Sequence, residues 1–286
     1  MDQPVSYTQE MCDYADKLYE PHWDRPCAWG IIEGEKLIAA IDFYLHEGFK
    51  LIGFDSCAYK NFNESCKEIR LELGYIPMKK EKLTREQLEI RAIHEEDWYA
   101  VEEMTQHAFW NKFRMGCSEH YMVDQLKEDE AYVPECSLVA LKDGKVIGAV
   151  LYAKAKVVGD DITHDILTFG PLCTHPDWQG TGVGEYLMKE SLALAKDLGY
   201  AGIVIFGEPD YYPRLGFKTC DHFGITTPDG KNFDALMGYA LDEEAFSRVH
   251  GKFYEPEVMG NLPEEKVEAF NKMFPPLEKQ YFPTQW

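Results

Sequence analysis

The sequence predicts an α/β domain built on a mixed central sheet flanked by helices. Asp143-Gly144 separates two apolar runs, at 137–141 and 146–158, and this dipeptide is the strongest short signal for an antiparallel hairpin. The run 201–206 is continuously apolar, which is typical of a strand buried on both faces. The intervening segment 184–198 has helical periodicity, so antiparallel and crossover connections are combined in one sheet.

The other elements follow from the same patterns of periodicity and punctuation. An alternating stretch ends just before His94, and a helical pattern then runs through Val101, Met104 and Phe109. Gly199 stands where a helix ends, and His175-Pro176 closes a strand. The expected elements in order are a strand at 88–93, a helix through Phe109, strands at 137–141, 146–158 and 166–174, a helix at 184–198, and strands at 201–206 and 236–241.

Composition excludes several classes of function. The 286 residues include 29 Lys and Arg against 50 Asp and Glu, a formal net charge of −21. Nucleic acids and anionic membranes require a cationic face, so neither is expected as a partner, whereas an acidic surface tolerates cationic amines. No apolar run approaches the ~18 residues of a membrane span. Neither the eight cysteines nor the nine histidines have metal-ligand spacing, so we expect reduced, mostly buried thiols, no metal, and a cytoplasmic protein.

The segment 170–185, GPLCTHPDWQGTGVGE, carries the clearest chemical signal. A strand leads into a turn with Gly180, Gly182 and Gly184, and a helix begins within the glycines. Glycines bring backbone amides close to a ligand, and the helix start adds unpaired N–H groups and the positive end of the helix dipole. Such an arrangement binds phosphate or pyrophosphate.

Two common phosphate motifs do not fit this segment. A dinucleotide fold requires G-x-G-x-x-G early in a strand–helix–strand unit, and these glycines have a different spacing and come after several strands. A nucleoside triphosphate loop requires a Lys after the last Gly, and none follows here.

The motif resembles the [RQ]-x-x-G-x-[GA] signature of the GNAT superfamily of N-acetyltransferases, with Gln179 as its first residue. The preceding block 170–176 resembles the fourth strand of that family. The block 206–217, FGEPDYYPRLGF, resembles a bacterial subgroup with G-[DE]-P-x-Y-Y-x-R-x-G-F. The resemblance covers about residues 85–240 and implies a GNAT fold, in which the mixed sheet is mostly antiparallel.

The resemblance implies acetyl-CoA as cosubstrate and direct attack of an amine on its thioester. The pantetheine arm would pair with the fourth strand, and the pyrophosphate would bind the amides after the glycine motif. Tyr212 stands where the family usually has the acid that protonates the leaving thiolate, and a phenol with a pKa of about 10 suits that role. The cofactor-binding residues implied are Leu172, Cys173, Thr174, Gln179, Gly180, Thr181, Gly182, Val183, Gly184 and Glu185.

Two departures from the family pattern concern the general base and the phosphates. Many members have a Glu in the fourth strand where this chain has Thr168, which cannot act as a base. We assign no base; Glu208 ranks first among the nearby candidates, and a water chain would suffice for some amines. The others are Asp165, His164, His175 and Asp210. Residues 171–188 contain no Lys or Arg, so phosphate binding is expected to depend on backbone amides.

The sequence divides into three parts, at 1–82, 83–241 and 242–286. The first resembles the second half of a GNAT domain, a helix–strand–helix segment without ligand machinery: Trp29, Ile32 and Arg70 replace the Gln, Gly and Tyr of the motifs. The second is the expected catalytic domain. The third is a C-terminal extension that is expected to pack on it and either dock on the sheet or line the acceptor pocket.

The leading functional hypothesis is an acetyl-CoA-dependent N-acetyltransferase that acts on a small-molecule or peptide amine. The alternative is a catalytically silent acyl-CoA-binding or sensing module, favoured by Thr168 and opposed by Tyr212 and the intact glycine motif. A homodimer assembled through the N-terminal segment is compatible with both.

Overall fold

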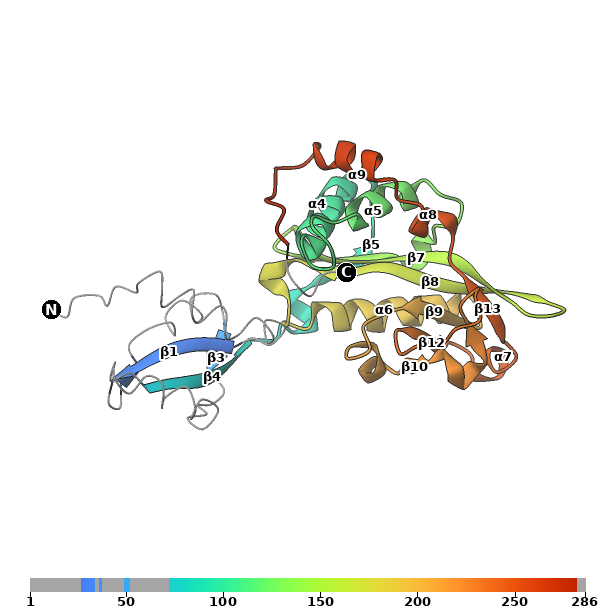
Figure 1. Cartoon of the computed structure of the whole chain (residues 1–286), viewed down its shortest axis with the longest axis horizontal. Helices are drawn as coiled ribbons and strands as arrows, with labels where there is room; N and C mark the ends of the chain where they lie inside the picture. Colours follow the sequence, from blue (N-terminus) through green and yellow to red (C-terminus); the bar gives the residue numbers. More distant parts are fainter. Residues whose placement is uncertain (1–26, 34–35, 38–48, 52–71, 282–286) are drawn as a thin grey trace. The chain divides into compact units, whose positions relative to one another are not determined.

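The computed structural model describes residues 27–33, 36–37, 49–51 and 72–281 (Figure 1). The chain divides into two compact units, Met1–Lys82 and Leu83–Trp286.

The described part of the first unit is a four-stranded antiparallel sheet in the order β2-β1-β4-β3. Trp29 and Ile32, which stand where the motif has Gln and Gly, lie on a strand. The helix expected after residue 38, and the matches expected at Asn63, Cys66 and Arg70, lie outside the described residues. The strands are β1 (Cys27–Glu33), β2 (Lys36–Leu37), β3 (Phe49–Leu51) and β4 (Glu72–Lys80).

The second unit has a mixed sheet in which most neighbours are antiparallel, as the sequence predicted. Its main path is β5-β6-β7-β8-β9-β12-β10, and only β8 and β9 in this path are parallel. β13 pairs with the far end of β7, and β11 pairs with β13. The strands are β5 (Glu89–Ala92), β6 (Leu138–Lys142), β7 (Lys145–Val158), β8 (Thr163–Thr174), β9 (Gly202–Phe206), β10 (Lys218–Thr219), β11 (Ile225–Thr226), β12 (Leu236–Ala240) and β13 (Gly251–Tyr254).

Helices cover both faces of this sheet (Figure 1). On one face, α4 (Trp98–Phe109) and α5 (Glu119–Lys127) bury apolar residues such as Val101 and Leu126. On the other, α6 (Val183–Asp197) buries Leu187 and Met188 against the core. The sequence analysis found α4 and α6 but not α5, whose nine residues include only a short apolar stripe.

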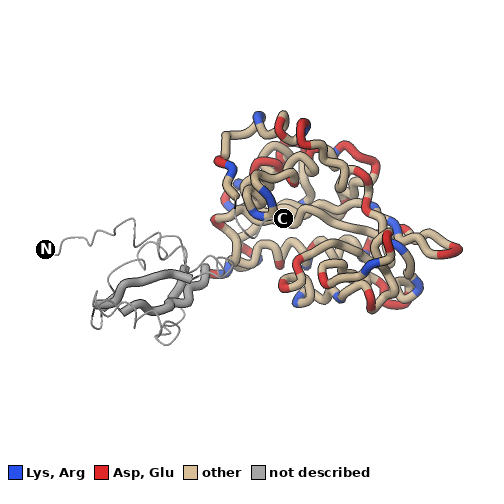
Figure 2. Tube along the Cα trace, in the orientation of Figure 1, with Lys and Arg blue, Asp and Glu red and all other residues tan. Residues whose placement is uncertain are grey.

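The chain after β12 returns to the face covered by α4 and α5. It forms α7 (Glu243–Phe246), β13, α8 (Glu257–Gly260) and α9 (Glu264–Asn271). Val267 and Phe270 of α9 pack against Tyr121 of α5, so the last helix adds a layer over that face (Figure 1). Acidic residues stand in the first and the last turn of α9. Figure 2 shows that acidic residues are distributed over the whole second unit.

No helix among the described residues combines the length and apolar character needed to cross a bilayer.

Gly202 gives a test of this packing. A Cβ at this position would lie only 2.2 Å from a ring carbon of Phe246, a fully buried residue of α7. Overpacking of this kind costs about 1–3 kcal/mol, so Gly202→Ala is expected to lower the midpoint of thermal unfolding clearly. Gly260→Ala is the matched control, because no atom lies within 4 Å of its added Cβ, and it should leave the midpoint nearly unchanged. Equal midpoints for both variants would contradict this packing.

Candidate active site

The two central parallel strands separate soon after they meet. β8 and β9 pair only at Leu167 and Ile203, although β8 continues to Thr174 and β9 to Phe206. On its other edge β8 stays paired with β7, where Cys173 lies opposite Ala149. Backbone N–H and C=O groups are obligatory hydrogen-bonding groups, so the β9-facing edge of residues 168–174 is left available to a ligand, except for the Thr174 carbonyl, which accepts from the Gln179 side chain.

The predicted pantetheine residues Leu172, Cys173 and Thr174 are the last three residues of β8 and lie along this edge. The predicted pyrophosphate residues follow directly. Gln179 ends a 3-10 turn, and its side-chain Nε2 donates to the Thr174 carbonyl at 3.2 Å, so it fastens the loop to the strand end. Gly180 and Gly182 adopt φ of 79° and 97°, a left-handed region that other residues enter at a cost.

The start of α6 presents several unengaged amides. Within the described residues, no hydrogen bond is donated by the backbone N–H groups of Gly180, Gly182, Val183 and Gly184. By contrast, the Thr181 amide donates to Trp178 and the Glu185 amide to Gly182, so these two predicted contacts are already used inside the chain. Unpaired amides at the start of a 15-residue helix, together with its dipole, form an anion site.

Arg214, from a later part of the sequence, is connected to this loop through Tyr211. A Cβ on Gly184 would lie 2.9 Å from the Tyr211 hydroxyl oxygen, so that hydroxyl is at the helix start. The Arg214 guanidinium stacks on the Tyr211 ring at 4.1 Å. The sequence analysis missed this cation because it considered only charges next to the loop along the chain.

Tyr212, the predicted acid, packs between β8 and the backbone that follows β9. It begins a 3-10 helix, Tyr212–Leu215, and its ring packs against Phe169 of β8 at 5.7 Å between centroids. A Cβ on Gly207 would be 2.5 Å from this ring, so the ring also lies on the backbone that follows β9. Burial raises the pKa of Tyr212 above its ordinary value, and the hydroxyl therefore carries its proton at neutral pH.

Cys173 is the one thiol among the predicted site residues, and it is poorly suited to nucleophilic attack. Its side chain is buried, with its sulfur 3.5 Å from the Thr105 hydroxyl of α4. Burial raises the pKa of the Cys173 thiol to about 12. Because the thiolate is the reactive form, a covalent acyl-cysteine step is not favoured.

The candidate bases from the sequence are scattered. Thr168 is fully buried, and its Oγ1 has no hydrogen-bond partner among the described residues. His164 and Asp165 lie at the start of β8, and the His175 ring is 5.7 Å from that of His107. Glu208 is exposed after β9, and so is Asp210.

The sequence did not single out two residues whose carboxylates have raised pKa values, Glu119 and Glu255. Burial raises the pKa of Glu119, at the start of α5, and its carboxylate accepts a hydrogen bond from the Ser118 amide at 2.9 Å. Desolvation by neighbouring protein also raises the pKa of Glu255, an exposed residue between β13 and α8. No sequence signal marked either residue, because each gains its environment from elements far along the chain.

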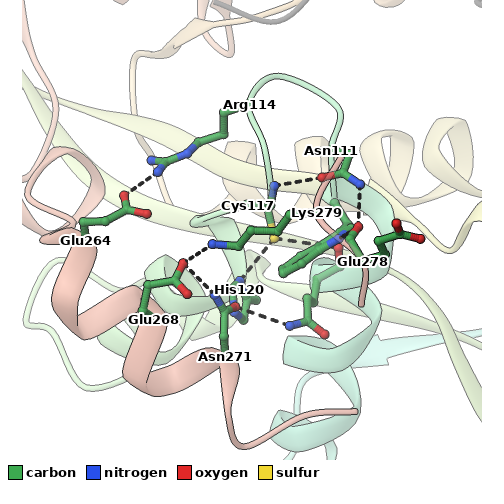
Figure 3. Close-up of polar contacts among 12 residues, drawn as sticks. Asn111, Arg114, Cys117, His120, Glu264, Glu268, Asn271, Glu278 and Lys279 are labelled. Carbon is green, nitrogen blue, oxygen red and sulfur yellow. Dashed lines mark hydrogen bonds and ion pairs between the residues drawn. The ribbon is translucent and has the colours of Figure 1, made fainter. Parts of the chain in front are cut away.

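The C-terminal tail is fixed to the connection between α4 and α5 (Figure 3). Trp110 Nε1 and Asn111 Nδ2 both donate to the Glu278 carbonyl at 2.8 Å. Asn111 Oδ1 accepts from the amides of Gly116, at 2.9 Å, and Gln280, at 3.1 Å. Ion pairs join Arg114 to Glu264 and Lys279 to Glu268. The tail therefore restrains this loop.

Within the part of the chain that the structure describes, no group of three or more His, Cys, Asp or Glu side chains is arranged to hold a metal ion.

Comparison with known proteins gives a consistent assignment. The model of the Acetyltransferase (GNAT) family matches residues 91–217. The chain is 30% identical to the uncharacterized N-acetyltransferase YhbS of Escherichia coli over 135 residues, which cover 47% of this chain and 78% of YhbS. It is 33% identical to the uncharacterized N-acetyltransferase YjhQ of Escherichia coli over 99 residues, 35% of this chain and 55% of YjhQ, so the chain spans about half the length of that relative.

A solved structure of a GNAT family N-acetyltransferase is also similar to this chain. The crystal structure of YhbS from Escherichia coli in complex with CoA superposes with a TM-score of 0.55 at 25% identity and covers 62% of this chain and 94% of that one. The chain therefore belongs to the GNAT family of acetyltransferases, and its second unit has the GNAT fold.

The thiols of the second unit give a prediction that is independent of any ligand. Cys117, Cys136, Cys173 and Cys220 are free and buried, and burial raises the pKa of each. All four should resist iodoacetamide in the native protein at about pH 8 and react after unfolding. Peptide mass spectrometry reads each site separately, and rapid native labelling of Cys173 would contradict its placement.

Proposed function

We propose that this chain is an acetyl-CoA-dependent N-acetyltransferase in which a primary amine attacks the thioester directly. One observation carries the proposal: an unpaired strand edge is followed, after one 3-10 turn, by four unengaged amides at the start of α6. The CoA complex of YhbS supports CoA as the ligand of this arrangement.

The cosubstrate would bind in two parts. The pantetheine arm would lie beside β8 and pair with the backbone of Leu172, Cys173 and Thr174 in place of the missing strand. The pyrophosphate would bind the amides of the glycine loop, where Gln179 fixes the loop and Arg214 adds positive charge.

The chemistry follows from the protonation states at the site. A neutral amine nitrogen forms a bond to the thioester carbonyl carbon, and the C–S bond breaks with its electron pair on sulfur. Tyr212 would donate its proton to that sulfur and regain one from the nitrogen as the amide forms. The raised pKa of Tyr212 keeps the donor protonated, and the raised pKa of Cys173 supports direct attack over an acyl-enzyme.

The acceptor is proposed to be a small-molecule or peptide amine, and the net charge of −21 favours a cationic one. A catalytically silent acyl-CoA sensor is the alternative function, supported by Thr168 at the position where many members have Glu.

The first 82 residues are proposed to be a degenerate GNAT-like segment without catalytic role, and residues 242–286 an extension of the catalytic domain at 83–241. The likeness of residues 1–82 to the second half of a GNAT domain supports the first part of this division. A homodimer through the N-terminal segment remains part of the proposal.

Tyr212→Phe tests the catalytic role. Loss of the acid should lower kcat by about 10²-fold or more, because general acid catalysis contributes about 10²–10⁴-fold, while acetyl-CoA affinity stays unchanged. Free thiol release measures kcat, and calorimetry measures affinity. Tyr99→Phe is the control, since Tyr99 is half exposed and stacks on Phe274. A silent sensor would show no thiol release in the parent protein, and equal turnover of both variants would contradict the role of Tyr212.

Gly180→Ala tests the phosphate site. The substitution strains a residue at φ 79° and reshapes the amides, so the Kd for CoA should rise about tenfold or more. Gly230→Ala is a matched control, because Gly230 has φ 81° and, like Gly180, has no atom within 4 Å of an added Cβ. An equal Kd for the two variants would show that the loop is only a turn.

A further inference from the structure

Phe206 places an aromatic ring beside the gap between β8 and β9. It is the last residue of β9, which runs parallel to β8 with Ile203 opposite Leu167. Parallel strands advance by nearly equal steps, so Phe206, three residues further on, stands across the gap from Gly170. The ring therefore lies at the end of β9 that has already separated from its partner.

The two faces of the sheet have different neighbours at this strand end. Tyr212 packs with Phe169 in the core under α6. Phe206 points away from that core, because Ile205 belongs to it and successive residues of a strand point to opposite faces. Its ring lies 5.7 Å from that of Phe253, a residue of a separate core. Tyr212 and Phe206 are thus on opposite faces at the end of β9.

Phe206 and Phe233 form an exposed, stacked pair. Their ring centroids are 5.9 Å apart and their planes differ by 13°. Phe206 is 45% exposed and Phe233 47%, although large apolar side chains are usually buried. The segment of Phe233 is fixed, because Asn232 Nδ2 donates to the Ile225 carbonyl at 2.7 Å and the Leu236 amide donates to the Phe233 carbonyl at 2.9 Å. The pair is a preformed apolar surface of the kind that binds ligands.

The other border of the gap on this face is also apolar. A Cβ on Gly170 would lie 2.9 Å from the methyl carbon of Met259 and 3.8 Å from that of Met122. Methionine side chains are flexible and polarizable, and they make favourable contacts with aromatic rings. On this face, methionine methyl groups therefore border β8 and a phenyl ring borders β9.

Acidic residues flank the aromatic pair. Asp234 follows Phe233, Glu208 lies two residues after Phe206, and both carboxylate side chains are exposed. The Glu208 carbonyl accepts from the Tyr212 amide at 3.2 Å, so this residue is next to the proposed acid. Carboxylates and aromatic ring faces both attract an ammonium group. The surroundings of the pair therefore fit a cation that carries an apolar body.

We propose that Phe206 and Phe233 bind the acceptor and select primary amines that carry an aromatic group. This inference rests on the proposed acetyltransferase function and names the substrate class of its acceptor site. The aromatic group stacks on the exposed rings, which places the nitrogen on the sheet face opposite Tyr212. The neutral nitrogen forms its bond to the thioester carbon, and the C–S bond breaks with its electron pair on sulfur. Tyr212 protonates that sulfur and regains a proton from the nitrogen.

The experiment uses the full chain with phenethylamine and ethylamine, which share an aminoethyl group and differ by the ring. The parent protein should have a kcat/KM about 10²-fold higher for phenethylamine. Phe233→Ala should lower kcat/KM for phenethylamine about tenfold, mainly through KM, and for ethylamine by less than about twofold. Phe233→Trp, which keeps an aromatic ring, should retain the preference, and acetyl-CoA affinity should be unchanged in both variants.

Tyr99→Ala is the matched control. Tyr99 is also half exposed and stacks on another ring, that of Phe274 at 5.3 Å, but it lies on α4. Its removal should leave the preference for phenethylamine unchanged. An equal loss for Phe233→Ala with both amines, or the same loss of preference for Tyr99→Ala, would overturn the inference.

Spermidine, a polyamine without a ring, separates the failure of this inference from the failure of the proposed function. Equal kcat/KM for phenethylamine and ethylamine, or transfer to spermidine and not to phenethylamine, would overturn the aromatic substrate class while the acetyltransferase function stands. Transfer to none of the three amines would contradict the proposed function, and the inference would fail with it.

Discussion

β8 pairs along its length with β7 on one edge, whereas on its other edge it pairs with β9 at a single position. The rest of the candidate site depends on this difference between the two edges. Ten residues of β8 pair with β7, from Thr163 opposite Val158 to Thr174 opposite Gly148, with one register shift between Val150 and Tyr152, whereas β9 pairs with it only at Leu167. A rigid strand with unpaired backbone groups at the centre of a sheet needs a partner of its own shape and polarity. An extended amide-containing chain such as pantetheine satisfies that need without any change in the sheet.

The C-terminal part of the chain completes what the central strands leave open. It returns across the face under α4 and α5, packs Met259 on Gly170, and fastens its tail to the loop at Trp110 and Asn111. The glycine loop and the C-terminal extension, which come from different segments of the chain, thus both contact β8.

The sequence predicted the mixed sheet, α4, α6 and the glycine loop, because each depends on local periodicity or on a turn that requires glycine. It missed α5, whose stability depends on burial of Val123 and Leu126 and not on a long pattern. It also missed Arg214, which stacks on Tyr211 at the start of α6, because only tertiary folding brings Tyr211 to that helix.

Calorimetric titration of acetyl-CoA into the full-length protein tests the central claim most directly. The unpaired edge of β8 and the free amides of α6 predict binding to one site that saturates well below about 1 mM, a free energy stronger than about −4 kcal/mol. The absence of binding at that concentration would contradict the account, because the separated strands and the glycine loop would then have no ligand to hold.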